Sequence, residues 1–91
     1  METINLNNLE EILNKIIYNS FMNLNNYMGS DTVYNYIKQI SEHVDIYIDE
    51  FLDYIYSELL TNYILEIDNI TLFNDNVLNK VLEISKIILE K

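Results

Sequence analysis

The residues best suited to chemistry are the single histidine of the chain, His43, and the acids around it, Glu42, Asp45, Asp49 and Asp53. A histidine can act as a general base, and a pair of carboxylates can cleave a glycosidic bond. No serine or cysteine nucleophile motif accompanies His43, however, and paired acids alone do not define a hydrolase. We therefore expect that the protein is not an enzyme.

Metal and cofactor motifs are also missing from the sequence. The chain has no cysteine and no Glu-x-x-His pattern, so it lacks a thiolate metal site and the ligands of a di-iron bundle. Asp68 and Asp75 lack the spacing and the glycine of a calcium-binding loop. A single glycine cannot form a glycine-rich phosphate loop. We expect no bound metal and no cofactor.

The acids are better suited to recognition. Asp45, Asp49 and Asp53 are four residues apart, so on a helix they would advance about 6 Å per step, the same order as the step between phosphates of a nucleic acid. Like charges at this spacing destabilise a helix by a few tenths of a kcal/mol per pair, and no lysine lies between Lys38 and Lys80. This uncompensated repulsion favours a function for the row, although an ordinary solvated face is the alternative.

Tyrosines flank this row and extend the candidate site. Tyrosine combines an apolar ring with a polar tip and is enriched at protein interfaces. Alternatively, half of these rings border the core. The predicted partner-binding residues are Glu42, Asp45, Tyr47, Asp49, Glu50, Asp53 and Tyr54.

Charge and composition limit the possible partners. The net charge is −10, with 15 acids, five lysines and no arginine, so direct binding to nucleic acid or to an anionic membrane is not expected. A basic protein surface is the complementary partner, although the charge could serve only solubility. Because 49% of the residues are hydrophobic, we also expect self-association or an apolar partner face. The start of the sequence contains no signal peptide and no run of about 20 apolar residues occurs, which predicts a cytoplasmic protein.

One long helix must position the candidate site. Its apolar residues recur every three or four positions, and we call them the apolar seam: Val33, Ile37, Ile40, Val44, Ile48, Phe51, Ile55 and Leu59. Ser41 and Thr61-Asn62 are possible breaks, but neither is accompanied by glycine or proline. The sequence therefore predicts a continuous helix over residues 32–66.

Two further helices are predicted on either side of it. The first covers residues 8–28, begins at Asn7 or Asn8, and ends at Gly29, where a left-handed residue is expected, before a cap at Ser30 or Asp31. Residues 63–75 suit a helix, a loop or a short hairpin, and we favour a loop over 68–75. The last helix is predicted over 75–90, with Asp75 as its cap. The expected fold is all-α, a single acidic domain over 1–91 built as a small bundle of three main helices with one long central helix.

These expectations lead to three hypotheses about function. Asn, Ile, Tyr and Leu dominate while Ala, Arg and Pro are absent, which indicates an AT-rich genome. The chain is similar in type, though not in any motif, to the small acidic inhibitors of phages and mobile elements, such as anti-CRISPR proteins and DNA mimics. We therefore expect an inhibitor that occupies a basic, nucleic-acid-binding surface. The alternatives are an assembly subunit that forms an obligate homodimer through its apolar helix face, and an immunity protein or antitoxin.

Overall fold

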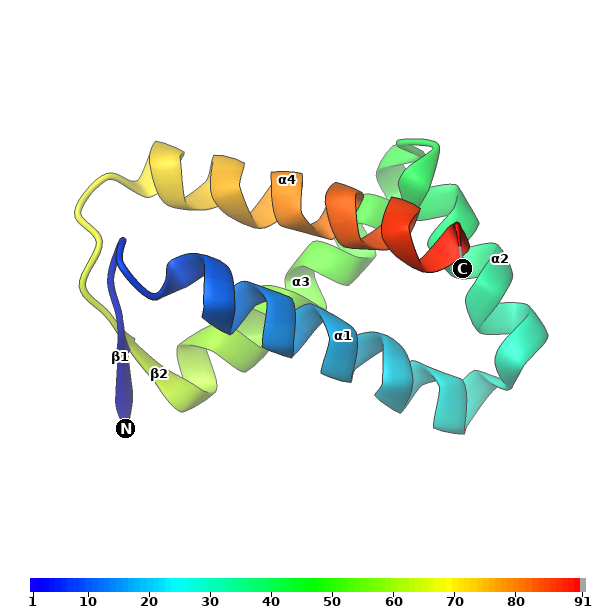
Figure 1. The fold of residues 1–91 in the computed structure, drawn as a ribbon, viewed down its shortest axis with the longest axis horizontal. Coiled ribbons are helices and arrows are strands. Elements are labelled where there is room, and N and C mark those ends of the chain that lie inside the picture. The colour runs from blue at the N-terminus through cyan, green and yellow to red at the C-terminus, as the bar shows by residue number, and fades with distance from the viewer. Residues whose placement is uncertain (91) are drawn as a thin grey trace.

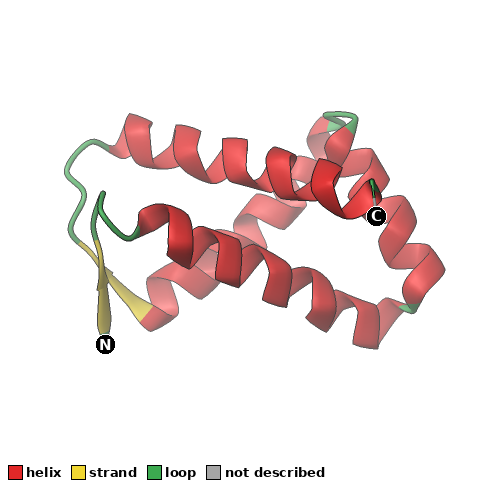
Figure 2. Cartoon of the chain, in the orientation of Figure 1, coloured by secondary structure: helices red, strands yellow, loops and turns green. Residues whose placement is uncertain are grey.

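In the computed structural model, which describes residues 1–90, helices form most of the chain (Figures 1 and 2). Among these residues, four helices and two short strands follow one another as β1 (Glu2–Ile4), α1 (Leu9–Met28), α2 (Ser30–Ser41), α3 (Asp45–Asn62), β2 (Tyr63–Leu65) and α4 (Ile70–Leu89). The all-α class is confirmed. The predicted bundle of three helices is wrong, because the long central helix is divided into α2 and α3.

Helices α1 and α4 lie side by side and run in roughly the same direction (Figure 1). Helix α2 crosses one end of this pair and makes its most extensive helix contact with α4. Helix α3 then returns diagonally behind both helices toward the strands. The four helices thus enclose one core within dimensions of 37 × 23 × 23 Å.

The break between α2 and α3 lies at Glu42–Val44, directly after Ser41. His43 adopts a positive φ of 65°. Its N–H donates to the carbonyl of Ile40 at 3.0 Å, and the N–H of Val44 donates to the carbonyl of Gln39 at 3.1 Å. These two bonds form a Schellman motif, in which histidine occupies the left-handed position that glycine usually takes. The prediction of a continuous helix over 32–66 is therefore wrong. The sequence does not reveal the break, because the usual marker of such a helix end, a glycine, is absent here.

The break allows the apolar seam to follow the core. An unbroken helix over 32–66 would be about 50 Å long, which exceeds the 37 Å length of the molecule. Residues on both sides of the break are instead buried in the same cluster, including Ile37 and Ile40 on α2 and Phe51 and Ile55 on α3. The periodicity of the seam was therefore a correct guide to burial, although it did not reveal the change in helix direction.

The connection between α1 and α2 is shorter. Gly29 ends α1 as predicted, with a positive φ of 83° and its N–H bonded to the carbonyl of Asn25 at 3.1 Å. Its ψ of 160° is extended, so the residue is not in the left-handed helical conformation. Gly29 itself is the N-cap of α2, and Ser30 and Asp31 belong to that helix, contrary to the predicted cap at Ser30 or Asp31.

The N-terminal segment pairs with a distant part of the chain. Strands β1 and β2 run parallel, and Ile4, which is almost fully buried, pairs with Leu65. Asn8 is the N-cap of α1, but its side chain turns back toward β1: its Nδ2 donates to the carbonyl of Thr3 at 2.8 Å, and its Oδ1 accepts from the N–H of Asn5 at 2.9 Å. This turn holds β1 against the start of α1.

The segment after α3 corrects two expectations. Residues 63–65 form β2, so the helix does not extend to residue 66, and the loop occupies 66–69 in place of 68–75. Helix α4 begins at Ile70, where the side chain of Asn69 accepts a hydrogen bond from the N–H of Leu72 at 3.0 Å. The cap is therefore Asn69, and Asp75 lies within the helix. Among the described residues, none of the helices is long and apolar enough to cross a membrane.

The positive φ of His43 leads to a stability prediction. Glycine tolerates this conformation without the steric cost that a Cβ imposes, so His43→Gly should have a free energy of unfolding about 0.5–1 kcal/mol higher than that of His43→Ala. Chemical denaturation monitored by circular dichroism measures both values. In a continuous helix the order would be reversed, because glycine is about 1 kcal/mol less favourable than alanine in a helix interior.

Candidate protein-interaction surface

The predicted acid row is present on α3. Asp45, Asp49 and Asp53 are all exposed and lie in regular helix. Of these three aspartates, only Asp45 has a lysine or histidine nitrogen nearby within residues 1–90, since its Oδ1 lies 4.0 Å from Nδ1 of the exposed His43. No lysine in this part of the chain forms an ion pair with Asp49 or Asp53. Asp49 and Asp53 are therefore exposed carboxylates without a lysine partner in the described part of the chain.

Glu42 is not part of the row. It is the C-cap residue of α2, and its N–H donates to the carbonyl of Lys38 at 3.0 Å. Its side chain is exposed in the turn that precedes α3. The position predicted from a continuous helix is therefore wrong, because Glu42 and Asp45 lie on opposite sides of the break.

The other predicted residues lie on a second side of α3. Successive residues of a helix are rotated by about 100°, so Tyr47 and Tyr54, seven positions apart, share one side and lie about 100° or more around the axis from the three aspartates. Glu50 lies between the two groups and nearer the tyrosines. The predicted site therefore consists of an aspartate flank (Asp45, Asp49 and Asp53) and a tyrosine flank (Tyr47, Glu50 and Tyr54).

The tyrosine flank is built on the aromatic core. The rings of Tyr47 and Tyr36 meet edge to face, with centroids 5.8 Å apart, and Tyr54 stacks on Phe51 at 6.4 Å. Tyr47 and Tyr54 remain 38% and 36% exposed. Each ring therefore borders the core and is also partly exposed to solvent; a role in partner binding stays a prediction.

A hollow opens beside Tyr47 where α1, α2 and α3 meet. Its volume is about 310 Å³, and its lining residues are Met28, Thr32, Asn35, Tyr36, Gln39, Tyr47 and Glu50. Only Tyr47 and Glu50 were predicted as site residues. The other five come from α1 and α2, and no signal in the sequence indicates that α2 crosses α3 at this point.

The electrostatics of the hollow act on Tyr36. Burial of its hydroxyl, reinforced by the nearby charge of Glu50, raises the pKa of Tyr36 to about 12. The phenol is therefore neutral at physiological pH, and the negative charge at the hollow comes from Glu50. No lysine is among the residues that line it.

The start of α4 contacts α3 at Tyr56, close to the aspartate flank. Tyr56, one turn beyond Asp53, packs its ring against Phe73 and donates its hydroxyl to Oδ1 of Asn74 at 2.9 Å. Burial, with a smaller contribution from the charge of Asp75, raises the pKa of Tyr56. Another acid, Asp75, thus lies near this flank, which increases its negative character.

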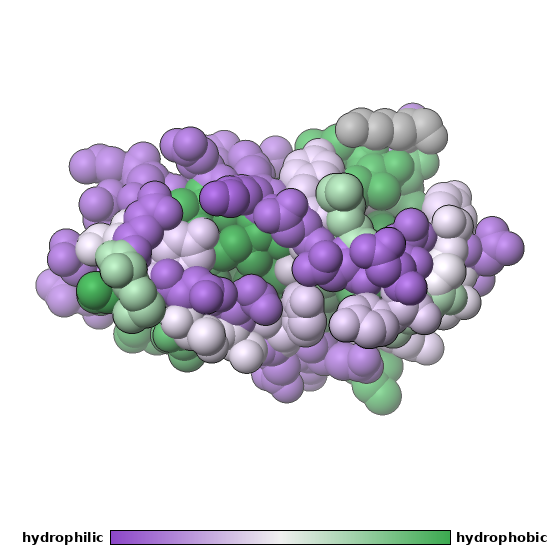
Figure 3. Space-filling view, turned by 90° about the horizontal axis from the view of Figure 1, so that it is seen from below, coloured by the Kyte–Doolittle hydropathy of each residue, from purple (hydrophilic) through white to green (hydrophobic). Residues whose placement is uncertain are grey.

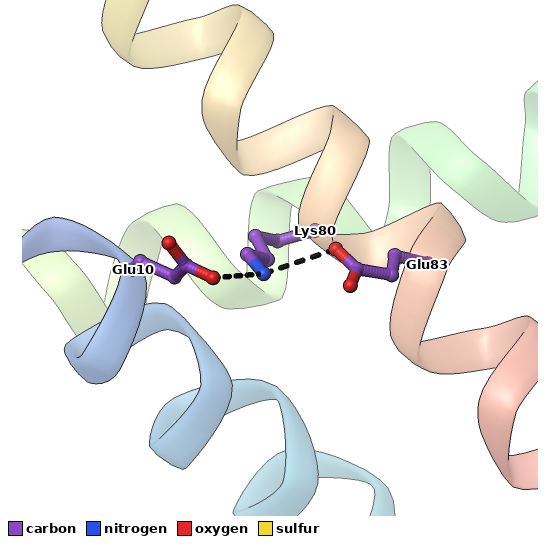
Figure 4. A network of polar contacts seen from close by, with 3 residues as sticks. All are labelled: Glu10, Lys80 and Glu83. Atoms are coloured by element: carbon purple, nitrogen blue, oxygen red, sulfur yellow. Dashed lines mark hydrogen bonds and ion pairs between the residues drawn. The ribbon is translucent and has the colours of Figure 1, made fainter.

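Compensated acids are found elsewhere. Nζ of Lys80 on α4 lies 2.9 Å from Oε1 of Glu10 on α1 and 3.0 Å from Oε2 of Glu83 (Figure 4). The hydrogen bonds lower the pKa of Glu10 and raise that of Lys80. This ion-pair network joins α1 and α4, so its acids have a structural partner that Asp49 and Asp53 lack.

Within residues 1–90, no group of three or more His, Cys, Asp or Glu side chains is placed to hold a metal ion. His43 lies in the turn between α2 and α3, where its backbone conformation ends α2.

Comparison with protein-family models, curated proteins and solved structures gave no match to this chain. Geometry and charge are therefore the basis for interpreting the surface.

The pKa of Tyr36 predicts alkaline destabilisation. A tyrosine has a pKa near 10.0 in the unfolded chain and about 12 here, so above pH 10 the unfolded state loses this proton first. The contribution of the protonated Tyr36 to the free energy of unfolding is complete below pH 10 and is lost as the pH rises through 12. We expect Tyr36→Phe to flatten the decline of the unfolding free energy over this range, as measured by urea denaturation at several pH values. Tyr27→Phe is the control, because Tyr27 is 88% exposed; an equal effect of both substitutions would contradict the assignment.

Proposed function

We propose that this chain is a protein-binding inhibitor that occupies a basic, nucleic-acid-binding surface of a target protein and so excludes nucleic acid from it. The observation that carries the proposal is the aspartate flank, an exposed row of carboxylates on a regular helix that has no lysine partner among residues 1–90. Its spacing of about 6 Å per step is of the order found between phosphates. A groove that binds phosphates therefore offers it complementary charge.

Electrostatic steering follows from the charge of the chain. A net charge of −10 accelerates the approach of a basic partner, most strongly at low salt. The tyrosine flank supplies the apolar contact, since tyrosines at the centre of an interface often dominate its binding energy. In this role the chain would be an inhibitor of the anti-CRISPR or DNA-mimic type, encoded by a phage or mobile element and active in the cytoplasm of the host cell.

Neutralising the aspartate flank tests this function. Asp45→Asn, Asp49→Asn and Asp53→Asn together should abolish capture of the target by the tagged protein, because they remove the charge that the basic groove recognises. The measurement is affinity capture from the host, followed by competition of the captured protein with its own nucleic acid. The helix should remain folded, since these changes also remove repulsion of a few tenths of a kcal/mol per i, i+4 pair.

The matched control removes three negative charges elsewhere. Glu11, Glu66 and Glu90 are exposed and lie outside α3, so their joint replacement by Gln should leave capture nearly intact. A folded aspartate variant that captures the same target as the original protein contradicts the proposal. So does a target that binds the protein and nucleic acid at the same time.

The assembly hypothesis has a different structural basis from the one predicted. Most of the apolar seam is buried within one chain, so it offers no surface for a second copy. Apolar residues are exposed instead where α1 and α2 meet: Met22, Tyr27, Met28 and Tyr34. A subunit that assembles through them should form a dimer whose dissociation constant changes little with salt. Sedimentation at several protein and salt concentrations measures this, and a monomer throughout would contradict the assembly hypothesis.

A further inference from the structure

The hollow between α1, α2 and α3 has the chemistry of a cation site. Tyr36, which is only 9% exposed, is among its lining residues, and its ring meets the ring of Tyr47 at an interplanar angle of 72°. Glu50 contributes a carboxylate, and Asn35 and Gln39 contribute side-chain amides. Seen from below, hydrophilic residues cover much of the molecule, with hydrophobic side chains visible between them (Figure 3).

This combination selects among classes of ligand. Aromatic faces attract cations through the ring quadrupole, and a carboxylate pairs with a guanidinium through charge-assisted hydrogen bonds. An anion would be repelled by Glu50, whereas a purely apolar group would remove water from that carboxylate without pairing it. At about 310 Å³ the hollow is at the small end of ligand pockets, roughly 300–1,000 Å³, which suits a single long side chain.

We propose that the hollow binds the guanidinium group of an arginine side chain from the basic partner, which packs against the ring surface that Tyr36 and Tyr47 present to the hollow and pairs with the carboxylate of Glu50. Arginine suits this site better than lysine because its planar group stacks on aromatic rings and offers several donors to carboxylate and amide oxygens. This inference rests on the proposed function for the source of the arginine. The binding chemistry itself requires only the hollow.

The position of the hollow supports an arginine supplied by a protein. Glu50 and Tyr47 lie on the tyrosine flank, next to the aspartate flank that would lie along a basic groove. The chain contains no arginine of its own, so the group must come from another molecule. Met28 borders the hollow with an exposed, flexible side chain, which can adjust to a stem of methylene groups.

The experiment uses a small probe, so it does not require the target protein. N-acetyl-arginine amide is titrated into the folded full-length protein while NMR records the methyl group of Met28 and the rings of Tyr36 and Tyr47. N-acetyl-citrulline amide, which has nearly the same shape but no charge, is the control ligand. We expect saturable shifts with the arginine probe and none at these residues with citrulline. Equal shifts with both ligands, or shifts with neither, overturn the proposal.

Two matched variants localise the charge. Glu50→Gln removes the carboxylate of the hollow and should weaken binding of the arginine probe about fivefold, the upper value for an exposed ion pair. Glu58→Gln removes one charge on the same helix outside the hollow and outside the aspartate flank, and it should change the affinity less than about twofold, as expected for a screened charge. Equal losses in both variants overturn the proposal, since they would show a general effect of charge. Thermal unfolding of each variant confirms that it is folded.

The results separate this inference from the proposed function. If the arginine probe binds and the aspartate variants still capture the target, the proposed function fails and the arginine site stands. If the aspartate variants lose the target but the probe does not bind, the arginine site fails and the proposed function stands.

Discussion

The arrangement of the candidate interaction surface depends on the ring contacts that the buried Phe51 makes. Its side chain is fully buried on α3 and stacks on Phe21 of α1, with ring centroids 4.5 Å apart. The ring of Tyr36 from α2 meets the Phe51 ring edge to face, with centroids 6.1 Å apart, and Tyr54 stacks beside Phe51 at 6.4 Å. One phenylalanine thus joins three helices, and its neighbours form the wall of the hollow and part of the tyrosine flank. Stability and the shape of the surface therefore share the same aromatic residues.

The seam could be predicted from the sequence, but its path could not. Apolar residues recur at helical spacing through Val44, so periodicity alone cannot distinguish one helix from two helices in line. The signal that separates them is a left-handed residue at the helix end, and here His43 takes that conformation where glycine would normally reveal it. Tertiary burial explains the result, because the bend lets Ile40 and Phe51 enter the same core. By contrast, Gly29 was an adequate local signal for the end of α1.

Contacts between distant segments also could not be predicted from the sequence. Strands β1 and β2 have three residues each and pair across most of the chain, and so short a strand carries no period that distinguishes it from a loop. The start of α4 was misplaced for a local reason: Asn69 and Asp75 are equally good caps by residue type. Within the candidate site, the exposure of Asp45, Asp49 and Asp53 followed from the helical period. The separation into two flanks and the contribution of Asn35 and Gln39 to the hollow depend on how α2 crosses α3.

The distribution of lysines explains why α3, and no other helix, is the proposed recognition element. Lys80 bridges Glu10 and Glu83 and so joins α1 to α4, whereas the sequence of α3 contains several acids and no lysine. The opposite face of α3 is anchored in the core by Phe51, Ile55 and Leu59. Burial of each large apolar side chain stabilises the fold by about 1.5–3 kcal/mol. This is several times the cost of one like-charge pair, so the helix tolerates the repulsion between its aspartates. A helix held this firmly by its apolar face can present unpaired carboxylates in a fixed row. Such preorganisation lowers the entropic cost of binding. The repulsion that slightly destabilises the free protein would be offset by attraction when the row contacts a basic surface.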